Sequence, residues 1–280
     1  MTMCRWLLRD WVFLLVIIWA ASMAPPAMAV ESCTWVPTVG EASLENVTAE
    51  EARQVATRRA RARAIEQVAG VEIQSGTILR DEVFAGEVLR ILARGFVVKE
   101  QLERWEQDNL RRTPDSAPTT LYRVFLRTCV ARARGDHDPY FRVDASLNKY
   151  TFAARESASI RVRCSRGCYL SILNLTGKDE FNLLLPTSKL PNLAQHPPRA
   201  GPEGDFVFPP PGVALEMAPL QGRQRDTEAF LVIAMKQPLN LPAIFRKEEG
   251  ISFEEVSHLL LGLPPSEWAD AWLVYEVRAK

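Results

Sequence analysis

The feature that most constrains the fold of this chain is a change in the spacing of its apolar side chains. Between residues 48 and 70, small apolar side chains recur every four residues, which is the spacing of one face of an α-helix. Beyond residue 140, apolar side chains alternate with polar ones in short runs separated by turn-forming residues. The chain is therefore predicted to join a long N-terminal helix to a second half built mostly of antiparallel strands.

The long helix is predicted to begin at a capping box. In Thr48-Ala49-Glu50-Glu51, the Thr48 hydroxyl can accept from the backbone N–H of Glu51, while the Glu51 carboxylate reaches back to the N–H of Thr48. Gly70 is the expected C-cap. A stripe of small side chains suits close packing against a sheet: Ala52, Ala56, Ala60, Ala64 and Val68. Arginines cover the other side, where we expect a solvated face: Arg53, Arg58, Arg59, Arg61 and Arg63.

The segments around this helix predict a small α+β domain over residues 30–134. Both of its helices should cover one face of an antiparallel sheet. The expected elements are a strand over Cys33–Ala42, the long helix, a second helix over Glu82–Ala93, and strands over Phe96–Trp105 and Leu121–Val130. Arg132–Pro139 is the predicted linker.

Residues 135–280 predict a mainly antiparallel β-sandwich domain, so the predicted fold class of the whole chain is α+β. Ser252 should cap a helix that runs to Leu261. Gln195–Pro211 is rich in Pro and Gly and should be an ordered loop with little regular structure. Strands are expected over Phe141–Leu147, Ser159–Cys164, Tyr169–Leu175, Phe181–Leu185, Val213–Met217, Phe230–Met235 and Trp272–Val277.

Residues 1–29 have the pattern of a secretory signal peptide. Arg5 and Arg9 precede the apolar run Trp11–Ala21, and Ala27-Met28-Ala29 offers a small-residue cleavage site, so we expect cleavage between Ala29 and Val30. The alternative is a retained membrane anchor, but the apolar run is shorter than the roughly 20 residues of a spanning helix. The predicted location of the mature protein is periplasmic or secreted.

Cysteine usage agrees with export. A lipoprotein is not expected, because Cys33 follows Val30-Glu31-Ser32 instead of a small apolar run. Cys4 leaves with the signal peptide, and the four remaining cysteines permit two disulfides in an oxidising compartment, with three connectivities.

One of those connectivities is favoured by the local sequence. Cys164 and Cys168 flank a three-residue connection between two alternating runs, which predicts a hairpin with a disulfide across its neck. By elimination, Cys33 and Cys129 would form a long-range bridge. Four free buried thiols are the alternative, and a zinc site is less favoured because no second His or Cys pair has suitable spacing.

Charge and motifs point away from several function classes. The 34 basic and 34 acidic residues balance, so nucleic acid is not an expected partner. The sequence contains no G-x-S-x-G elbow, H-E-x-x-H pair or glycine-rich phosphate loop. We therefore predict no catalytic, cofactor-binding or metal-binding residues, and no cofactor.

A few polar and aromatic residues are candidates for a metal-binding or partner-binding site. The histidines His137, His196 and His258 have no visible partner in the sequence; His137 lies between aspartates in a turn-forming stretch, where metal binding is less favoured than a turn. Trp268 and Trp272 could present an aromatic face to a partner or glycan, but core packing is favoured because apolar residues follow directly.

Two family resemblances cover most of the chain. Val39-Gly40-Glu41-Ala42, the capping box and Ala60 to Val71 resemble the N-terminal domain of flagellar assembly protein T and related envelope lipoproteins, over about residues 33–134. The later motifs Gly167 to Leu173, Leu183 to Pro186 and Phe208 to Gly212 resemble the domain of unknown function 4384 family. Together these resemblances imply an exported bacterial protein without an assigned activity. A flagellar role does not transfer, because only the first domain resembles that protein.

The predicted function is that of a non-enzymatic exported cell-envelope protein, a binding or assembly module in the bacterial periplasm. Its partners would be other envelope proteins, and peripheral association with the outer membrane is compatible with this prediction. The candidate binding surfaces are the loop Gln195–Pro211 and open strand edges, which expose backbone donors and acceptors. The alternative is an envelope hydrolase with an active site assembled between the two domains.

Overall fold

The structure is a computed structural model that describes residues 33–44, 47–69, 95–111, 117–189, 199–202 and 204–280. The signal peptide with its Ala29–Val30 cleavage site, the helix expected over Glu82–Ala93 and Gly70 lie outside the described residues. The described elements are helices and mostly antiparallel strands, which agrees with the α+β class. Cys33–Lys280 group by their contacts into one compact unit, and a domain boundary near residue 134 stays a prediction.

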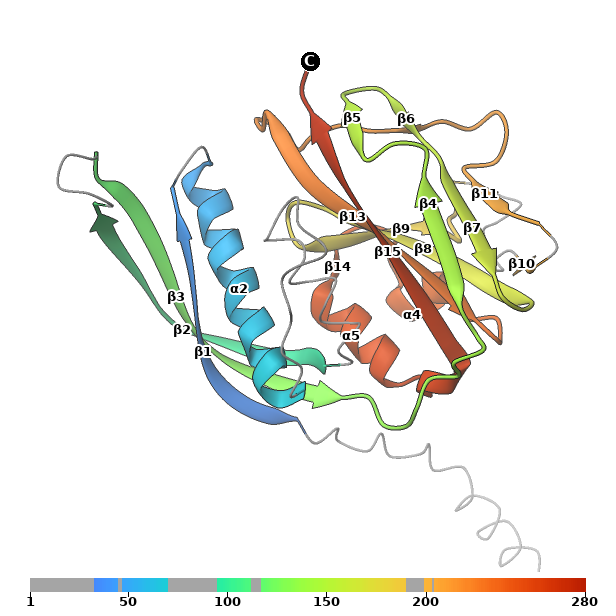
Figure 1. Cartoon of the computed structure of the whole chain (residues 1–280), viewed down its shortest axis with the longest axis horizontal. Helices are drawn as coiled ribbons and strands as arrows, with labels where there is room; N and C mark the ends of the chain where they lie inside the picture. The colour runs from blue at the N-terminus through green and yellow to red at the C-terminus, as the bar shows by residue number, and fades with distance from the viewer. Residues whose placement is uncertain (1–32, 45–46, 70–94, 112–116, 190–198, 203) are drawn as a thin grey trace, which may run out of the picture. The chain divides into compact units, whose positions relative to one another are not determined.

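The elements include most of the predicted ones and several that were not expected (Figure 1). In chain order they are β1 (Thr34–Ser43), α2 (Ala49–Ala69), β2 (Gly95–Leu110), β3 (Thr119–Arg132), β4 (Val143–Leu147), β5 (Thr151–Ala153), β6 (Ser157–Ala158), β7 (Ile160–Cys164), β8 (Cys168–Leu175), β9 (Glu180–Leu185), β10 (Arg199–Ala200), β11 (Phe206–Phe208), β12 (Leu215–Glu216), β13 (Arg225–Met235), α4 (Leu241–Phe245), β14 (Ile251–Ser252), α5 (Phe253–Leu261), a 3-10 turn (Pro265–Glu267) and β15 (Trp268–Arg278). No helix among these described elements is long and apolar enough to cross a membrane.

Helix α2 packs against a three-stranded sheet of order β1-β3-β2, and Figure 1 shows it running along these strands. The predicted stripe is its buried side: Ala52, Ala56, Ala60 and Ala64 are fully buried. The helix lies so close to β1 that a Cβ added to Gly40 would stand 1.8 Å from the carbonyl oxygen of Ala56. Alanine on the helix and glycine on the strand therefore allow backbone to approach backbone.

The start of α2 is as predicted, but only part of its arginine face is solvated: Arg53 and Arg63 are exposed, whereas Arg58 is buried and Arg59 and Arg61 are half-buried. Thr48 and Glu51 form the capping box, with the two reciprocal hydrogen bonds at 2.6 and 3.2 Å. Arg58 is only 6% exposed and is paired with Asp179. Arg59 donates to the Glu41 carbonyl at 2.8 Å. The expectation of a fully solvated arginine face was therefore wrong. Hydrogen-bond acceptors from segments distant in the sequence cover part of this face, and the charge pattern of the helix alone does not indicate them.

The second half is sandwich-like, with helices added on one side. Its main sheet has the order β14-β9-β8-β13-β15-β5, with β10 beside β8. One face of this sheet shares a core with a smaller sheet of order β11-β7-β4, and that core includes Ile160, Leu170 and Val232. The other face packs with α4 and α5 through residues such as Leu231, Phe245 and Leu260. The strand alternation predicted by the sequence thus fills two cores, one on each face.

The two halves of the chain share buried side chains. Phe96, at the start of β2, is 1% exposed and belongs to the same apolar cluster as Leu260 and Trp268 of the second half. Leu261 of α5 packs against Cys129 of β3. Because these contacts are apolar and buried, the first sheet is anchored in the second half at one end.

Both cysteine pairs lie at disulfide distance, with the connectivity that the sequence favours: Cys33–Cys129 and Cys164–Cys168. The hairpin expected between Cys164 and Cys168 is wrong, however. β7 pairs with β4 and β11, whereas β8 pairs with β9, β10 and β13, so the two strands belong to different sheets. Alternating runs on either side of a short turn predict two strands but not whether they pair, and here the bridge fastens one sheet of the sandwich to the other.

The segment expected to be a loop also takes part in the sheets. Gln195–Pro198 lie outside the described residues, but Arg199–Ala200 pair with β8 and Phe206–Phe208 pair with β7. Phe208 is buried in the sandwich core. Proline and glycine content was misleading here because these short strands form at sheet edges, where breaks in the ladder are tolerated.

The close approach of α2 to β1 predicts a severe effect of a single methyl group. We expect Gly40→Ala to lower the free energy of unfolding by at least about 2 kcal/mol, because the new Cβ collides with backbone that cannot move aside. Gly204→Ala is the matched control: a Cβ there meets nothing within 4 Å, so we expect a change within about 0.5 kcal/mol. Urea unfolding of both variants measures the difference, and equal stabilities would contradict this account of the packing.

The disulfides predict unequal losses on removal. In the chain-entropy relation, the Cys33–Cys129 bridge, with a sequence separation of 96, should stabilise the folded state by about 4–5 kcal/mol. The Cys164–Cys168 bridge, with a separation of 4, should stabilise it by about 2 kcal/mol. We therefore expect Cys33→Ser/Cys129→Ser to unfold at lower urea than Cys164→Ser/Cys168→Ser. Intact mass after alkylation without reductant should show no modified cysteine in the mature wild type. The reverse order of stabilities would refute the loop-length argument.

Candidate functional site

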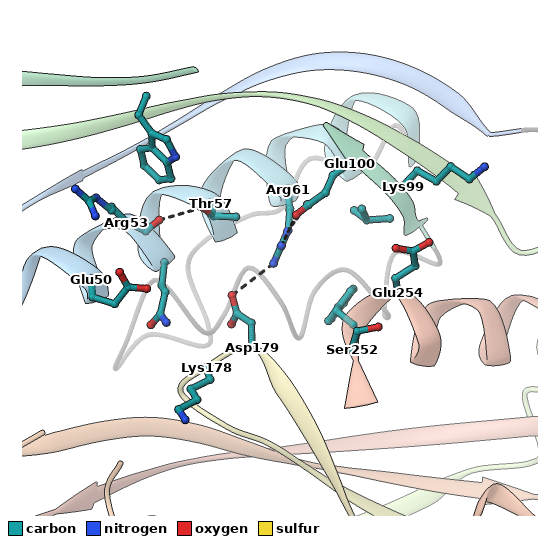
Figure 2. A pocket seen from close by; sticks show the side chains of 14 residues that line it. Glu50, Arg53, Thr57, Arg61, Lys99, Glu100, Lys178, Asp179, Ser252 and Glu254 are labelled. Carbon is teal, nitrogen blue, oxygen red and sulfur yellow. Dashed lines mark hydrogen bonds and ion pairs between the residues drawn. The ribbon is translucent and has the colours of Figure 1, made fainter. Parts of the chain in front are cut away.

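A pocket of about 410 Å³ is bounded by α2, β2, the turn between β8 and β9, and the start of α5. Figure 2 shows its side chains, which are mostly charged and of both signs. None of the described lining residues is a histidine or a cysteine. We call this hollow the charged pocket.

The centre of the charged pocket is a closed ion-pair network. Arg61 of α2 donates to both carboxylate oxygens of Glu100 on β2, each at 2.6 Å, and lies 3.4 Å from Asp179. Asp179 also accepts from the buried Arg58 at 2.5 Å. The dashed lines in Figure 2 trace the Arg61 contacts. Two arginines thus face two carboxylates, so the buried charges are compensated within the protein.

The geometry of the β8–β9 turn directs Asp179 towards α2. Asp179 has φ of 62°, in the left-handed region that Asp tolerates better than most residues. Thr176 holds the turn, because its hydroxyl donates to the Glu180 carbonyl at 3.1 Å. The sequence Thr176-Gly177-Lys178-Asp179 by itself indicates only a turn, and the position of the Asp179 carboxylate against α2 is a property of the tertiary structure.

Other charged groups around the charged pocket are not compensated in this way. Within the described residues, no ion pair is formed by Arg53, Lys99, Lys178 or Glu50, although the Arg53 guanidinium stacks 5.2 Å from the Tyr122 ring centroid. Glu254 lies 3.5 Å from His258. Trp105 is 37% exposed and supplies an aromatic side chain to the wall. These groups remain available to a ligand.

The hydroxyl groups of the charged pocket are already engaged with backbone. Thr57 donates to the Arg53 carbonyl at 3.1 Å, and Ser252 caps α5 by accepting from the N–H of Glu255 at 3.2 Å. The described lining contains no histidine, which is the usual general base beside a nucleophilic hydroxyl group. No group of three or more His, Cys, Asp or Glu side chains in the described ranges could hold a metal ion. The pocket is therefore suited to recognising charges.

A smaller hollow of about 120 Å³ lies beside the charged pocket and shares Gln54 with it. Arg223 spans this hollow: it donates to Asp226 at 2.7 Å and to Gln54 of α2 at 3.0 Å. Asp226 is buried and also accepts from the backbone N–H of Leu220. Through these contacts a second set of polar bonds joins α2 to the sandwich-like half.

A buried polar cluster lies inside the sandwich near this junction. Tyr275 is 2% exposed, and its hydroxyl oxygen lies 2.7 Å from the Glu228 carboxyl oxygen and 2.7 Å from the Asn174 side-chain oxygen. The Asn174 amide donates to Glu228 at 3.0 Å. Two oxygen–oxygen contacts need two protons, but the tyrosine hydroxyl supplies only one. A protonated Glu228 completes the ring, donating to Tyr275, which then donates to Asn174.

The environment of Glu228 agrees with a neutral carboxyl group. Burial raises the pKa of Glu228 above its ordinary value, the polar contacts with Asn174 and Tyr275 oppose this rise, and nearby Asp226 raises the pKa further. Burial likewise raises the pKa of Tyr275 well above its ordinary value. Since charge is costly in this interior, the cluster acts as a set of neutral hydrogen bonds.

The residues weighed as sites from the sequence do not meet in the charged pocket. His137 packs edge-on against the Trp268 ring, with centroids 5.2 Å apart, and His196 lies outside the described residues. Asp138 is held by Lys236 at 2.9 Å, and this hydrogen bond keeps the pKa of Asp138 below its ordinary value. Trp268 is 1% exposed, so the favoured core packing is confirmed for it.

A second candidate surface is the side of the β1-β3-β2 sheet opposite α2, which we call the outer face. Tyr122, Val124 and Leu126 of β3 pack towards α2, so the alternate residues of β3 point outward. On the outer face, Arg127 lies over the Trp35 ring at 5.7 Å and Arg104 over the Phe125 ring at 3.5 Å. Trp35 is 38% exposed. Arginine stacked on an exposed aromatic ring is a typical component of protein–protein interfaces.

A scan of the chain against protein-family models finds no match, and a search of curated proteins finds no similar sequence. The resemblances to flagellar assembly protein T and to the domain of unknown function 4384 family therefore stay predictions.

Sequence reasoning missed the residues that carry both polar clusters. Arg61, Asp179 and Glu228 come from separate elements, and no local spacing links them. A weak signal was present in the stretch Asp226 to Ile233, where a glutamate precedes an apolar strand and lies on its inward-facing side. An acid in register with buried strand residues indicates a satisfied or neutral carboxyl group.

The ring around Glu228 predicts a pH dependence of stability. A raised folded-state pKa means that this residue's stabilising contribution is complete below the unfolded pKa of about 4.3 and is lost as the pH rises through the folded pKa. We expect Glu228→Gln, which keeps a neutral donor and acceptor, to flatten this part of the pH profile of the free energy of unfolding. Urea unfolding across pH 4 to 9 measures both profiles.

Glu228→Ala provides the contrast. It should cost about 2 kcal/mol at pH 5, because Tyr275 and Asn174 lose a buried hydrogen-bond partner. Two results would exclude the neutral ring. One is that Glu228→Gln is as destabilising as Glu228→Ala at pH 5. The other is that the wild type becomes more stable relative to Glu228→Gln as the pH rises.

Proposed function

We propose that this chain is a non-enzymatic exported cell-envelope protein that acts as a binding or assembly module in the bacterial periplasm. In this proposal residues 1–29 are removed on export, and residues 30–134 and 135–280 form two modules that work together, the second of them a β-sandwich. The two disulfides are compatible with a non-cytoplasmic location. The partners would be other envelope proteins.

The observation that carries this proposal is the outer face. A sheet in a globular protein normally buries at least one face, and α2 covers one face of the β1-β3-β2 sheet. The outer face still presents Trp35, Phe125 and their stacked arginines. Aromatic and arginine side chains give the largest energies at protein interfaces, so this surface supports the binding of a protein.

The charged pocket supports binding more than hydrolysis. A hydrolase assembled between the two halves would place its reacting groups here, because this is where α2 and β2 face the β8–β9 turn. Both central carboxylates, Glu100 and Asp179, are paired with arginine, and both hydroxyls are bonded to backbone. An acid or base held in this way is poorly placed to exchange a proton with a substrate.

The proposal is tested by photocrosslinking in living bacteria that produce the full chain. A benzophenone amino acid replaces Trp35 or Arg127 on the outer face, and Tyr150, exposed in the second half, is the control position. We expect discrete protein adducts from the two outer-face positions and none from Tyr150. Fractionation of the same cells should place the protein in the periplasm, with Val30 as its first residue.

Two results would refute the proposal. One is a cytosolic protein that begins at Met1 and carries four free thiols. The other is the same adduct pattern from all three positions, which would indicate non-specific contact. The hydrolase alternative would gain support if the purified mature protein turned over an ester or glycoside and Glu100→Gln abolished that turnover while leaving the fold intact.

A further inference from the structure

The charged pocket has more cations than anions available for a ligand. Arg58 and Arg61 are balanced by Asp179 and Glu100, as described above. Around this neutral centre, Arg53, Lys99 and Lys178 form no ion pair within the described residues. The acidic groups at the rim are Glu50 and Glu254, and Glu254 already has His258 at 3.5 Å. Three cations thus remain with two rim carboxylates, and this surplus of one positive charge favours an anionic ligand.

The cations come from three separate elements. Arg53 is on α2, Lys99 on β2 and Lys178 in the β8–β9 turn, and Figure 2 shows them spread around the pocket and not converging on one point. A single phosphate or carboxylate could not bridge them. The geometry calls for an extended ligand that carries several anionic groups, spaced along its length.

Two further features favour a polypeptide as that ligand. β2 is the end strand of the described sheet, where it pairs with β3, and an end strand can be extended by the backbone of a bound peptide. The Trp105 side chain, on β2, adds an exposed aromatic surface to the pocket wall. Backbone pairing together with acidic and apolar side chains describes an extended acidic peptide.

We propose that the charged pocket binds an extended acidic peptide segment of a partner protein, with Lys99 and Lys178 as its charge contacts and Trp105 as its apolar contact. This inference rests on the proposed function, because it assigns a chemistry to part of the partner. It goes beyond the outer face, since the pocket and the outer face are lined by different side chains and can be tested independently.

The test uses the mature chain, residues 30–280, and a fluorescently labelled eight-residue peptide of alternating glutamate and valine. Fluorescence anisotropy at low salt measures its dissociation constant. We expect Lys99→Gln/Lys178→Gln to weaken binding about 3- to 10-fold, because each exposed charge pair contributes roughly 0.2–1 kcal/mol. Lys149→Gln/Lys189→Gln is the matched control, since it removes two exposed lysines that pair with Glu156 and Glu249 away from the pocket.

Peptide variants separate charge from shape. The peptide with glutamine in place of glutamate should bind more weakly, and the lysine peptide should not bind. Trp105→Phe should retain most of the affinity, whereas Trp105→Ala should lose about 3-fold or more. The substituted positions of the pocket are on its rim, so thermal unfolding should show the variants folded as the wild type.

Three outcomes would overturn the inference. They are equal affinity for the glutamate and glutamine peptides, an equal loss in the control double variant, and binding of polygalacturonate through Lys99 and Lys178 when the glutamate peptide does not bind. The last would indicate an acidic polysaccharide as the ligand. If the peptide fails while the outer-face adducts persist in cells, the pocket inference falls and the proposed function stands; loss of those adducts as well would remove the proposed function.

Discussion

The packing of α2 against β1 is the contact on which the rest of this structure depends. Four buried alanines and Gly40 let the helix backbone approach the strand closely, and this distance fixes how far the opposite side of the helix projects. That side carries Arg58 and Arg61, which reach Asp179 in the second half. A bulkier stripe would lift the helix from the sheet and displace both arginines from their carboxylates.

The second requirement is that buried charge be compensated where the two halves meet. Arg58, Arg61 and Arg223 each face a carboxylate, and the raised pKa of the buried Glu228 favours its neutral form beside Tyr275 and Asn174. Such networks contribute less to net stability than apolar burial does, because the charges lose their hydration. Their contribution is to orientation: Phe96 anchors the base of the sheet in the second core, and the ion pairs set the position of α2 above it.

The same arrangement creates the outer face and the charged pocket. Because α2 covers only one face of the sheet and lies mainly along β1 and β3, the outer face and the inner side of β2 remain accessible. The charged pocket forms where β2, α2 and the β8–β9 turn converge, and around its central ion pairs the rim carries both cations and carboxylates. The exposed aromatics lie on the outer face, and the rim charges surround the charged pocket.

Local sequence determined the longer elements, because their signals lie within a few residues, but it did not reveal short ones such as α4, β10 and β11. The capping box, the alanine stripe and the alternating runs are all readable along the chain, as is the favoured cysteine pairing. It could not determine whether β7 pairs with β8, whether the arginine face of α2 is solvated, or which carboxylate stays neutral. Those outcomes depend on groups such as Arg58 and Asp179, 121 residues apart, whose desolvation and pairing exist only once the sheets and α2 are packed together.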